Sequence, residues 1–427
     1  MYAAAVLFCV SGWAGTGPNI DVSPISSAFD AMDATISGEG GEVVRVHLLS
    51  NVLGEEVSYS WAEYEVPTGK SRLLDLRPRS GLTEIDSRWR LFWSQRPVRD
   101  AESLKLYGEH MKDLDADTRY LFLLEMAGEF IEKRKVQVDR DRRPSVRPYS
   151  RGRVSGTVYM PQSVGPHPAL LLIGGYPPRE LSHLGHAFAA RGMIVFHINY
   201  HVDREGKQCF SNVPAEMFED ALGEIRAMGS VDASRIGVLG ISRGAEIVPY
   251  IARRANGVGF AIMAAFSAWP LGGGCGGSPW TVSGEPVGVL PSTGWQRDDI
   301  QSARILRRVH AAGLQDSPML PMGLIDVPTL MIGAEHDEMV PSVLSVDKIC
   351  AMYGCGGGSL LTAFKAEGAD HLVVHPPWLP FPCQGNDKRV PSDLFGRCET
   401  AAVAIEKTYS RIAEFIGEHA RIALEPD

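Results

Sequence analysis

The sequence predicts an α/β protein in which helices cover a mostly parallel sheet, with a smaller all-β region before it. Two observations carry this prediction. After Arg153, continuous apolar runs alternate with segments of helical pattern, which is the rhythm of strand–helix–strand units. Between about Ile20 and Val138, short strand-like runs are separated by polar or glycine-containing segments, as in a small sandwich of strands.

Length and composition narrow the class of protein. At roughly 100–200 residues per domain, 427 residues correspond to two or three domains, or to one large domain with an appendage. The apolar fraction of 44% and the charged fraction of 22% exclude a disordered, collagen-like or multi-span membrane protein. A net charge of −9 argues against a nucleic-acid partner or an anionic membrane. We expect a leader and tail in 1–19, a β-sandwich in 20–140 and the α/β domain in 141–427.

Each element of the all-β region is predicted from a short run rich in β-branched and aromatic residues. These runs are Val43–Leu48, Val57–Trp61 and Tyr120–Leu124. The region holds no obvious acid–base constellation, so we expect it to be structural or to shape a pocket. The following segment, Asp139–Arg153, is rich in Arg, Asp, Pro and Ser, and we interpret it as a solvated linker.

The α/β domain is predicted from apolar runs that parallel strands need because both their faces are buried. The expected strands are Val154–Met160, Ala169–Ile173, Met193–Ile198, Arg235–Leu239, Phe260–Met263 and Thr329–Ile332. The expected helices are Leu181–Arg191, Pro214–Met228, Gly244–Arg254 and Ala401–Ile416. This alternation predicts that the carboxyl ends of the parallel strands share one edge of the sheet.

The strongest chemical signal is the segment Gly240-Ile241-Ser242-Arg243-Gly244. A bare GxSxG is common by chance, but here it lies between a buried strand and a helix, which is the context of a nucleophilic serine. The glycines allow a sharp turn that exposes the Ser242 hydroxyl above the strand. The alternative interpretation is an ordinary glycine-rich turn between a strand and a helix.

A nucleophilic serine needs a base and an acid that orients the base, and in this architecture the order along the chain is serine, then acid, then histidine. Asp337 follows the strand Thr329–Ile332 in a turn, which puts its carboxylate at the same sheet edge as Ser242. Glu335 and Glu338 are rivals for this role, and any of these acids could instead be a surface charge.

His371 is the expected base, because it follows the strand-like run Leu360–Phe364 after a glycine-containing turn. His375 is its rival, whereas His336 is too close to the acid in sequence to be its partner. The spacing of His371 and His375 resembles that of metal ligands, but two prolines follow, and we expect neither a metal nor a cofactor.

An oxyanion hole needs two backbone amides aimed at the developing negative charge. One is expected from Arg243, directly after the nucleophile. The second is expected from the loop after the strand that ends at Ile173, with Tyr176 as first choice and Gly175 as second. The two prolines that follow Tyr176 have no amide hydrogen and are excluded.

The number of cysteines and the N-terminal sequence indicate in which cellular compartment the protein is expected. The apolar run Ala3–Val10 has the length of a signal-peptide core and is too short to span a bilayer, although no Lys or Arg precedes it. Cleavage after Ala14 would leave six of the seven cysteines, enough for complete pairing: Cys209, Cys275, Cys350, Cys355, Cys383 and Cys398. We therefore expect a periplasmic or secreted, disulfide-bonded protein. A cytoplasmic protein with buried free thiols and a frayed or buried first segment is the alternative.

With these residues placed, the chain resembles the acyl-CoA thioesterase and bile acid-CoA:amino acid N-acyltransferase family. The resemblance covers most of the chain, through IGGYPPRELSHLGHAFAARGMIVFHINYH, EMFEDALGEI, RIGVLGISRGAE, GAEHDE, GADHL and PPWLP. It implies an α/β-hydrolase domain in which Ser242 is the nucleophile, Asp337 the acid and His371 the base. A weaker match through SRWRLFWSQRP implies an immunoglobulin-like N-terminal domain.

The resemblance implies a serine hydrolase that cleaves an acyl thioester or ester. The acyltransferase branch typically has cysteine as nucleophile, so Ser242 favours transfer to water. An exported carboxylesterase or peptidase-like hydrolase, an N-acyltransferase and a non-catalytic binding protein remain as alternatives. Export would separate the enzyme from acyl-CoA, which is an intracellular metabolite.

Overall fold

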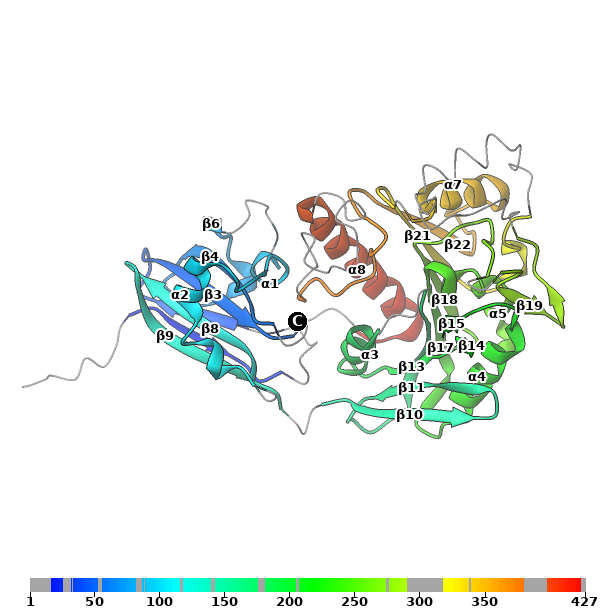
Figure 1. Ribbon diagram of the computed structural model, residues 1–427, viewed down its shortest axis with the longest axis horizontal. Helices are drawn as coiled ribbons and strands as arrows, with labels where there is room; N and C mark the ends of the chain where they lie inside the picture. Colours follow the sequence, from blue (N-terminus) through cyan, green and yellow to red (C-terminus); the bar gives the residue numbers. More distant parts are fainter. Residues whose placement is uncertain are drawn as a thin grey trace, which may run out of the picture.

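The computed structural model describes most of the chain as two lobes that lie side by side (Figure 1). The described residues are 17–25, 32, 34–52, 56–81, 87, 89–115, 118–139, 143–175, 181–204, 207–273, 276–289, 318–337, 339–379 and 398–423. The apolar core of the predicted signal peptide, Ala3–Val10, lies outside these residues, and the signal peptide stays a prediction. None of the described helices is long and apolar enough to cross a lipid bilayer.

The described strands of the first lobe form two antiparallel sheets. The larger sheet has the order β6-β4-β3-β8-β9, with β7 paired to β4, and the smaller has the order β1-β2-β5. Their bounds are β1 Asn19–Val22, β2 Ala34–Gly38, β3 Val43–Ser50, β4 Ser58–Glu65, β5 Gly69–Arg72, β6 Ser80–Gly81, β7 Arg96–Pro97, β8 Thr118–Met126 and β9 Glu129–Gln137. Ile36, Val46 and Phe122 belong to one buried apolar cluster, which the alternation of side chains along each strand makes possible. Two sheets agree with the expected sandwich, and its immunoglobulin-like character stays a prediction.

The second lobe is built on an eight-stranded sheet of the order β10-β11-β13-β12-β17-β18-β21-β22 within the described residues. Its strands are β10 Ser145–Arg151, β11 Val154–Met160, β12 His167–Ile173, β13 Ile194–Ile198, β17 Val231–Ile241, β18 Phe260–Ala264, β21 Thr329–Ala334 and β22 Leu361–Ala366. The pairs from β13 to β22 are parallel, and β10 and β11 are antiparallel to their neighbours. The predicted α/β-hydrolase fold is confirmed.

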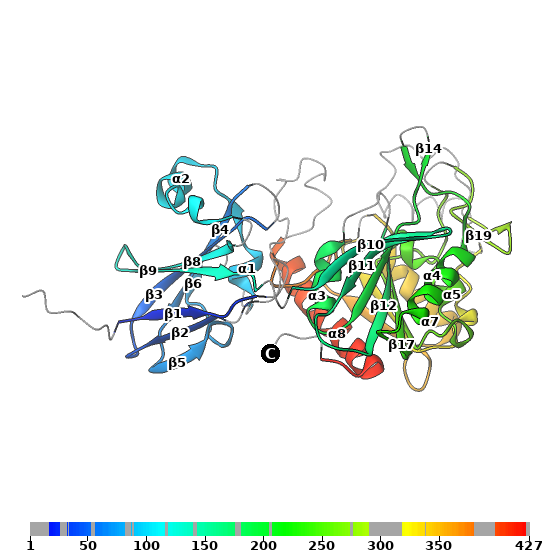
Figure 2. The same ribbon diagram turned by 90° about the horizontal axis from the view of Figure 1, so that it is seen from below.

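Helices cover both faces of this sheet (Figure 2). One face packs on α3 and α8, and the other on α4, α5 and α7. The helices are α3 Ser182–Ala189, α4 Ala215–Ala227, α5 Val248–Ile251, α7 Ser342–Tyr353 and α8 Cys398–Ala420. Along β12, Leu170 and Leu172 face the first set of helices and Leu171 the second, so each strand supplies two apolar cores.

Two local predictions differ from the structure. The expected linker contains a strand, because Ser145–Arg151 forms β10 at the edge of the sheet and pairs with β11. An edge strand leaves one side open, so it tolerates charged side chains and Pro148. The expected helix Gly244–Arg254 is broken into a 3₁₀ turn, Ser242–Ala245, and the short α5. Pro249 lacks the amide hydrogen that a continuous helix would need there.

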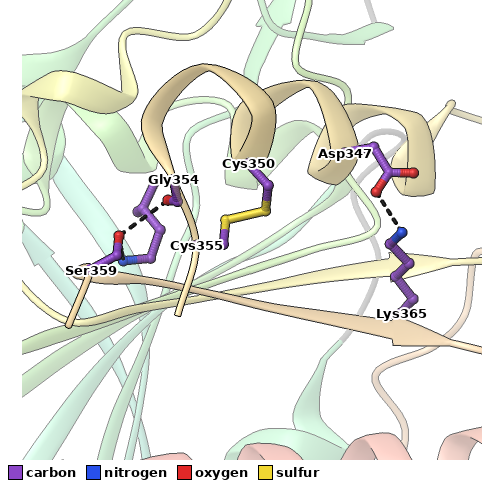
Figure 3. Close-up of a disulfide and its surroundings, with 7 residues drawn as sticks. Asp347, Cys350, Gly354, Cys355, Ser359 and Lys365 are labelled. Carbon is purple, nitrogen blue, oxygen red and sulfur yellow. Dashed lines mark hydrogen bonds and ion pairs between the residues drawn. A yellow bond between two sulfur atoms is a disulfide. The ribbon is translucent and has the colours of Figure 1, made fainter. Parts of the chain in front are cut away.

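A disulfide closes the end of α7 (Figure 3). It joins Cys350 to Cys355, whose Cα atoms lie 5.0 Å apart, across the turn that leads toward β22. On the same side of the helix, Lys365 of β22 forms an ion pair with Asp347 at 2.5 Å. Cys275 and Cys383 lie outside the described residues, and only the backbone is described for Cys209 and Cys398, so pairing of all six cysteines stays a prediction.

The two lobes share one continuous apolar cluster. Trp89, from the first lobe, packs its ring against Trp378 of the second, with centroids 5.5 Å apart. The Ser87 hydroxyl donates a hydrogen bond of 2.7 Å to Glu406 on α8, which lies between the first lobe and the sheet (Figures 1 and 2). Trp378 follows the predicted base His371 by seven positions, so this contact lies close in sequence to the candidate site.

Candidate active site

Ser242 occupies a tight turn at the carboxyl end of β17. Its φ of 56° is in the left-handed region, which costs a residue with a side chain about 1–3 kcal/mol. Close packing on both sides holds this conformation. A Cβ on Gly240 would lie 2.6 Å from the Ala245 Cα, and one on Gly244 would lie 2.3 Å from the Gly174 carbonyl oxygen. Both glycines are therefore required, and the turn presents the serine hydroxyl at the sheet edge.

The structure brings the three predicted side chains together in one hydrogen-bonded line. His371 Nε2 lies 3.0 Å from Ser242 Oγ. On the other side of the ring, His371 Nδ1 lies 2.9 Å from Asp337 Oδ1 and 3.0 Å from Asp337 Oδ2. Because β17, β21 and β22 run parallel in one sheet, with β18 between β17 and β21, the loops after them meet at the same edge.

Backbone amides fix the Asp337 carboxylate. Its Oδ1 accepts hydrogen bonds of 3.0 Å from the amides of Met339 and Val340, and the residue is 5% exposed. An ionised carboxylate only accepts hydrogen bonds, so His371 donates through Nδ1. Nε2 then carries the lone pair, and it faces the Ser242 hydroxyl, which is the arrangement that lets a histidine accept the serine proton.

The rivals for these roles lie elsewhere. Glu335 is more than half exposed, and its Oε2 accepts a hydrogen bond of 2.8 Å from the Gly368 amide. His375 donates from Nδ1 to its neighbour Pro376 at 2.8 Å. His336 has a half-exposed side chain, and Glu338 lies outside the described residues. Among the described residues, no group of three His, Cys, Asp or Glu side chains could hold a metal ion.

Only part of the expected oxyanion hole can be placed. Gly175 lies directly against the nucleophile, since a Cβ on it would be 2.9 Å from Ser242 Cβ and 3.3 Å from Ser242 Oγ. Arg243 is the second residue of the 3₁₀ turn Ser242–Ala245, which follows β17. Tyr176 lies outside the described residues, so its role stays a prediction.

A buried ionic network beside the nucleophile was not foreseen from the sequence. Arg243 Nη1 donates to Glu246 Oε1 at 2.5 Å, and Nη2 donates to the carbonyls of Leu271 and Gly272 at 2.6 and 3.1 Å. The indole Nε1 of Trp280 donates to Glu246 Oε2 at 3.1 Å. Burial raises the pKa of the Glu246 carboxyl to about 7, and the neighbouring Arg243 opposes this rise. The network ties the nucleophile turn to the segment after β18.

One sequence signal could have revealed this network. Glu246 is the lone charge in the otherwise apolar or small run that follows the nucleophile turn, Gly244–Ile251. A carboxylate in such a run must be paired once it is buried. The sequence did not identify the partner Trp280, which lies 34 positions further along the chain.

Replacing Glu246 with alanine is expected to lower the free energy of unfolding by about 3–5 kcal/mol. The change leaves the buried Arg243 guanidinium and the Trp280 indole without their shared acceptor. Glu414→Ala is the control, because Glu414 pairs with Arg411 at the surface and an exposed pair is worth about 0.5 kcal/mol. Urea unfolding followed by tryptophan fluorescence measures both, and equal losses in the two variants would contradict the prediction.

Part of the second lobe matches a known protein family. Residues 213–421 match the family described as BAAT / Acyl-CoA thioester hydrolase C terminal. This segment, just under half of the chain, is similar to the C-terminal domain of that family. The matched segment begins at β16 (Val213–Pro214), ends just after α8, and contains Ser242, Asp337 and His371. The family resemblance expected from the sequence is confirmed.

Relatives of the chain include two mouse proteins. "Acyl-coenzyme A amino acid N-acyltransferase 1" is 25% identical over 289 residues, which cover 63% of this chain and 64% of the relative. "Acyl-coenzyme A thioesterase 2, mitochondrial" is 22% identical over 244 residues, which cover 56% of this chain and 52% of the relative. The chain therefore spans between about half and two thirds of the length of these curated relatives.

Among solved structures, similar chains include the "Putative Dienelactone Hydrolase from Klebsiella pneumoniae subsp. pneumoniae MGH 78578". It is 13% identical and has a TM-score of 0.42, and the similarity covers 64% of this chain and 99% of that one. An α/β hydrolase from Penicillium, GrgF, is also 13% identical, with a TM-score of 0.40 over 65% of this chain and 99% of that one.

Proposed function

We propose that the protein is a serine hydrolase that cleaves an acyl thioester, or an ester, through an acyl-enzyme intermediate. The observation that carries this proposal is the continuous line of hydrogen bonds from Asp337 through His371 to Ser242. Its order along the chain, serine then acid then histidine, is the order of α/β-hydrolase enzymes. The family of the domain points to thioesters as substrates.

In the proposed mechanism, His371 Nε2 takes the proton from Ser242 as Oγ bonds to the substrate carbonyl carbon. The tetrahedral oxyanion accepts hydrogen bonds from the backbone amide of Arg243 and from that of Tyr176 or Gly175. Collapse breaks the bond to the thiol or alcohol, which leaves with the proton from His371. Water then gives a proton to His371 and attacks the acyl-enzyme, and Ser242 regains its proton. Asp337 stabilises the imidazolium in both steps.

Thioester hydrolysis is the first choice among the possible reactions. The curated relatives are named both for thioesterases and for N-acyltransferases, so their names alone do not select one. The identity of the nucleophile distinguishes the two reactions. A serine forms an oxygen ester with the acyl group, and this ester is less reactive toward amines than the thioester that a cysteine would form. Transfer of the acyl group to water is therefore favoured over transfer to an amino acid.

A side-by-side substrate panel tests this proposal. We expect turnover of acyl-CoA thioesters, with free thiol released in proportion to enzyme, and no acyl-amino acid product when glycine or taurine is added. Matched p-nitrophenyl esters and peptide substrates form the comparison arms. Cleavage of esters without cleavage of any acyl-CoA would leave a carboxylesterase and overturn the thioesterase assignment. Absence of all turnover and of labelling by a fluorophosphonate probe would overturn the hydrolase itself.

A further inference from the structure

A buried tyrosine is hydrogen-bonded to the backbone that lies against the nucleophile. Tyr200 follows β13 by two residues and is 2% exposed. Its hydroxyl donates to the Gly174 carbonyl at 2.8 Å and is also 3.4 Å from the Gly175 carbonyl. The ring is held among other aromatic rings, with that of Phe218 at 5.7 Å and that of Trp280 at 5.4 Å. Burial raises the pKa of the phenol, which therefore stays protonated and remains a donor.

The two carbonyls that this hydroxyl contacts belong to the turn that leaves β12. A trans peptide is planar, with its carbonyl and its amide hydrogen pointing in opposite directions. Fixing the Gly174 carbonyl therefore also fixes the direction of the Gly175 amide. Gly175 is the residue that approaches Ser242 so closely that a Cβ would lie 3.3 Å from Oγ. The hydrogen bond from the Tyr200 hydroxyl to the Gly174 carbonyl therefore sets the orientation of the Gly175 amide, which belongs to the same peptide plane and to a residue beside the nucleophile.

We propose that Tyr200 is a positioning residue for the oxyanion hole, and that its hydroxyl holds the Gly174–Gly175 peptide in the orientation that serves the transition state. The inference rests on the proposed function, because it presupposes attack by Ser242. An amide that is already aligned stabilises the oxyanion more than the ground-state carbonyl. Loss of the hydroxyl should therefore lower kcat and leave KM almost unchanged.

The hydroxyl, and not the ring, carries this role. The ring fills space in an apolar cluster with Phe210, Phe218 and Trp280, and phenylalanine at position 200 would keep that packing. A direct part in proton transfer is disfavoured because the hydroxyl is already engaged by the two carbonyls. Tyr200→Phe is therefore a change of one hydrogen-bond donor with little change of volume.

In Tyr200→Phe we expect kcat to fall about 10- to 100-fold, with KM within about twofold of the wild-type value. Loss of an oxyanion donor itself costs about 100- to 1,000-fold, and a misaligned donor costs less. An alkyl boronic acid, which forms a tetrahedral adduct with serine, should lose affinity by about the same factor as kcat/KM. Competitive inhibition measures this loss, which a role confined to stability would not produce.

Two control variants separate the hydroxyl from packing. Tyr149→Phe removes a hydroxyl that donates to Glu224 at 2.5 Å at the far edge of the same sheet, and kcat should be unchanged. Phe218→Leu disturbs the ring cluster around Tyr200 without touching its hydroxyl, and it should lower Tm with little effect on kcat. If Phe218→Leu lowers kcat as much as Tyr200→Phe, packing explains the loss and the proposal is overturned.

Failure of this inference can be told apart from failure of the proposed function. A wild-type protein that neither turns over any ester or thioester nor reacts with a fluorophosphonate contradicts the hydrolase itself. A wild-type protein that is active, with a Tyr200→Phe variant of unchanged kcat and boronate affinity, contradicts only the role of Tyr200. A rise in KM at constant kcat would also contradict it, because that pattern indicates lost substrate binding.

Discussion

Ser242→Ala is expected to lower kcat by about 10⁶-fold and to leave the fold intact. Alanine removes the atom that would bond to the acyl carbon, and His371 then has no proton to take. The structural cost is small because the only described hydrogen bond of the hydroxyl is with His371 at 3.0 Å. Steady-state release of thiol measures kcat, and circular dichroism with Tm verifies that the variant is folded.

A matched control for this variant is Ser94→Ala, which removes a buried hydroxyl in the first lobe. Its kcat should equal that of the wild-type protein. Some rate above that in water should survive in Ser242→Ala, since amides and substrate binding still act on the transition state. A purified Ser242→Ala enzyme with more than about one hundredth of wild-type kcat would contradict the nucleophile assignment, since that loss is far short of about 10⁶.

Asp337→Asn is expected to lower kcat by about 10⁴-fold. The Asp337 carboxylate accepts from His371 Nδ1 and from two backbone amides, so it sets which ring nitrogen carries the proton. An asparagine amide facing Nδ1 would donate instead, which would leave the proton on Nε2 and remove the acceptor for the Ser242 proton. Measurement of kcat with a saturating acyl-CoA substrate tests this result.

The double variant Ser242→Ala/Asp337→Asn sharpens the assignment. Groups that act as one unit are strongly non-additive, so the double variant should be no slower than Ser242→Ala alone. Glu335→Gln is the control, because it retains an acceptor for the Gly368 amide at the exposed neighbour of the acid. If the losses of the two single variants multiply in the double variant, the two residues do not act together.

The central residues of the candidate site could be predicted because they follow from topology. Strand patterns placed Ser242, Asp337 and His371 in the segments that follow β17, β21 and β22, and parallel strands bring their carboxyl ends to one edge. Tyr200 could not be predicted in this way. Its partner Gly174 is 26 positions earlier, and a hydrogen bond to a backbone carbonyl leaves no mark on the side-chain pattern of either segment.

Elements at the edges of the fold were harder to predict than those at its centre. The continuous apolar run of β12 indicates a buried strand. The edge strand β10, in contrast, has the charged composition of a linker. Its membership in the sheet depends on pairing with β11, which no property of residues 145–151 records. The contact of Trp89 with Trp378 is hidden for the same reason, since each tryptophan alone indicates only a buried site.

The contact between Trp89 and Trp378 determines whether the two lobes can be separated or exchanged. Separating the lobes would expose the rings of Trp89 and Trp378 to water and leave the Glu406 carboxylate without the Ser87 hydroxyl. An apolar interface of this kind is typical of the core of one domain. Interfaces between independent domains are more polar. The first lobe is therefore not exchangeable for an unrelated β-sandwich. A different sandwich fused to the α/β lobe would need side chains that fit this interface.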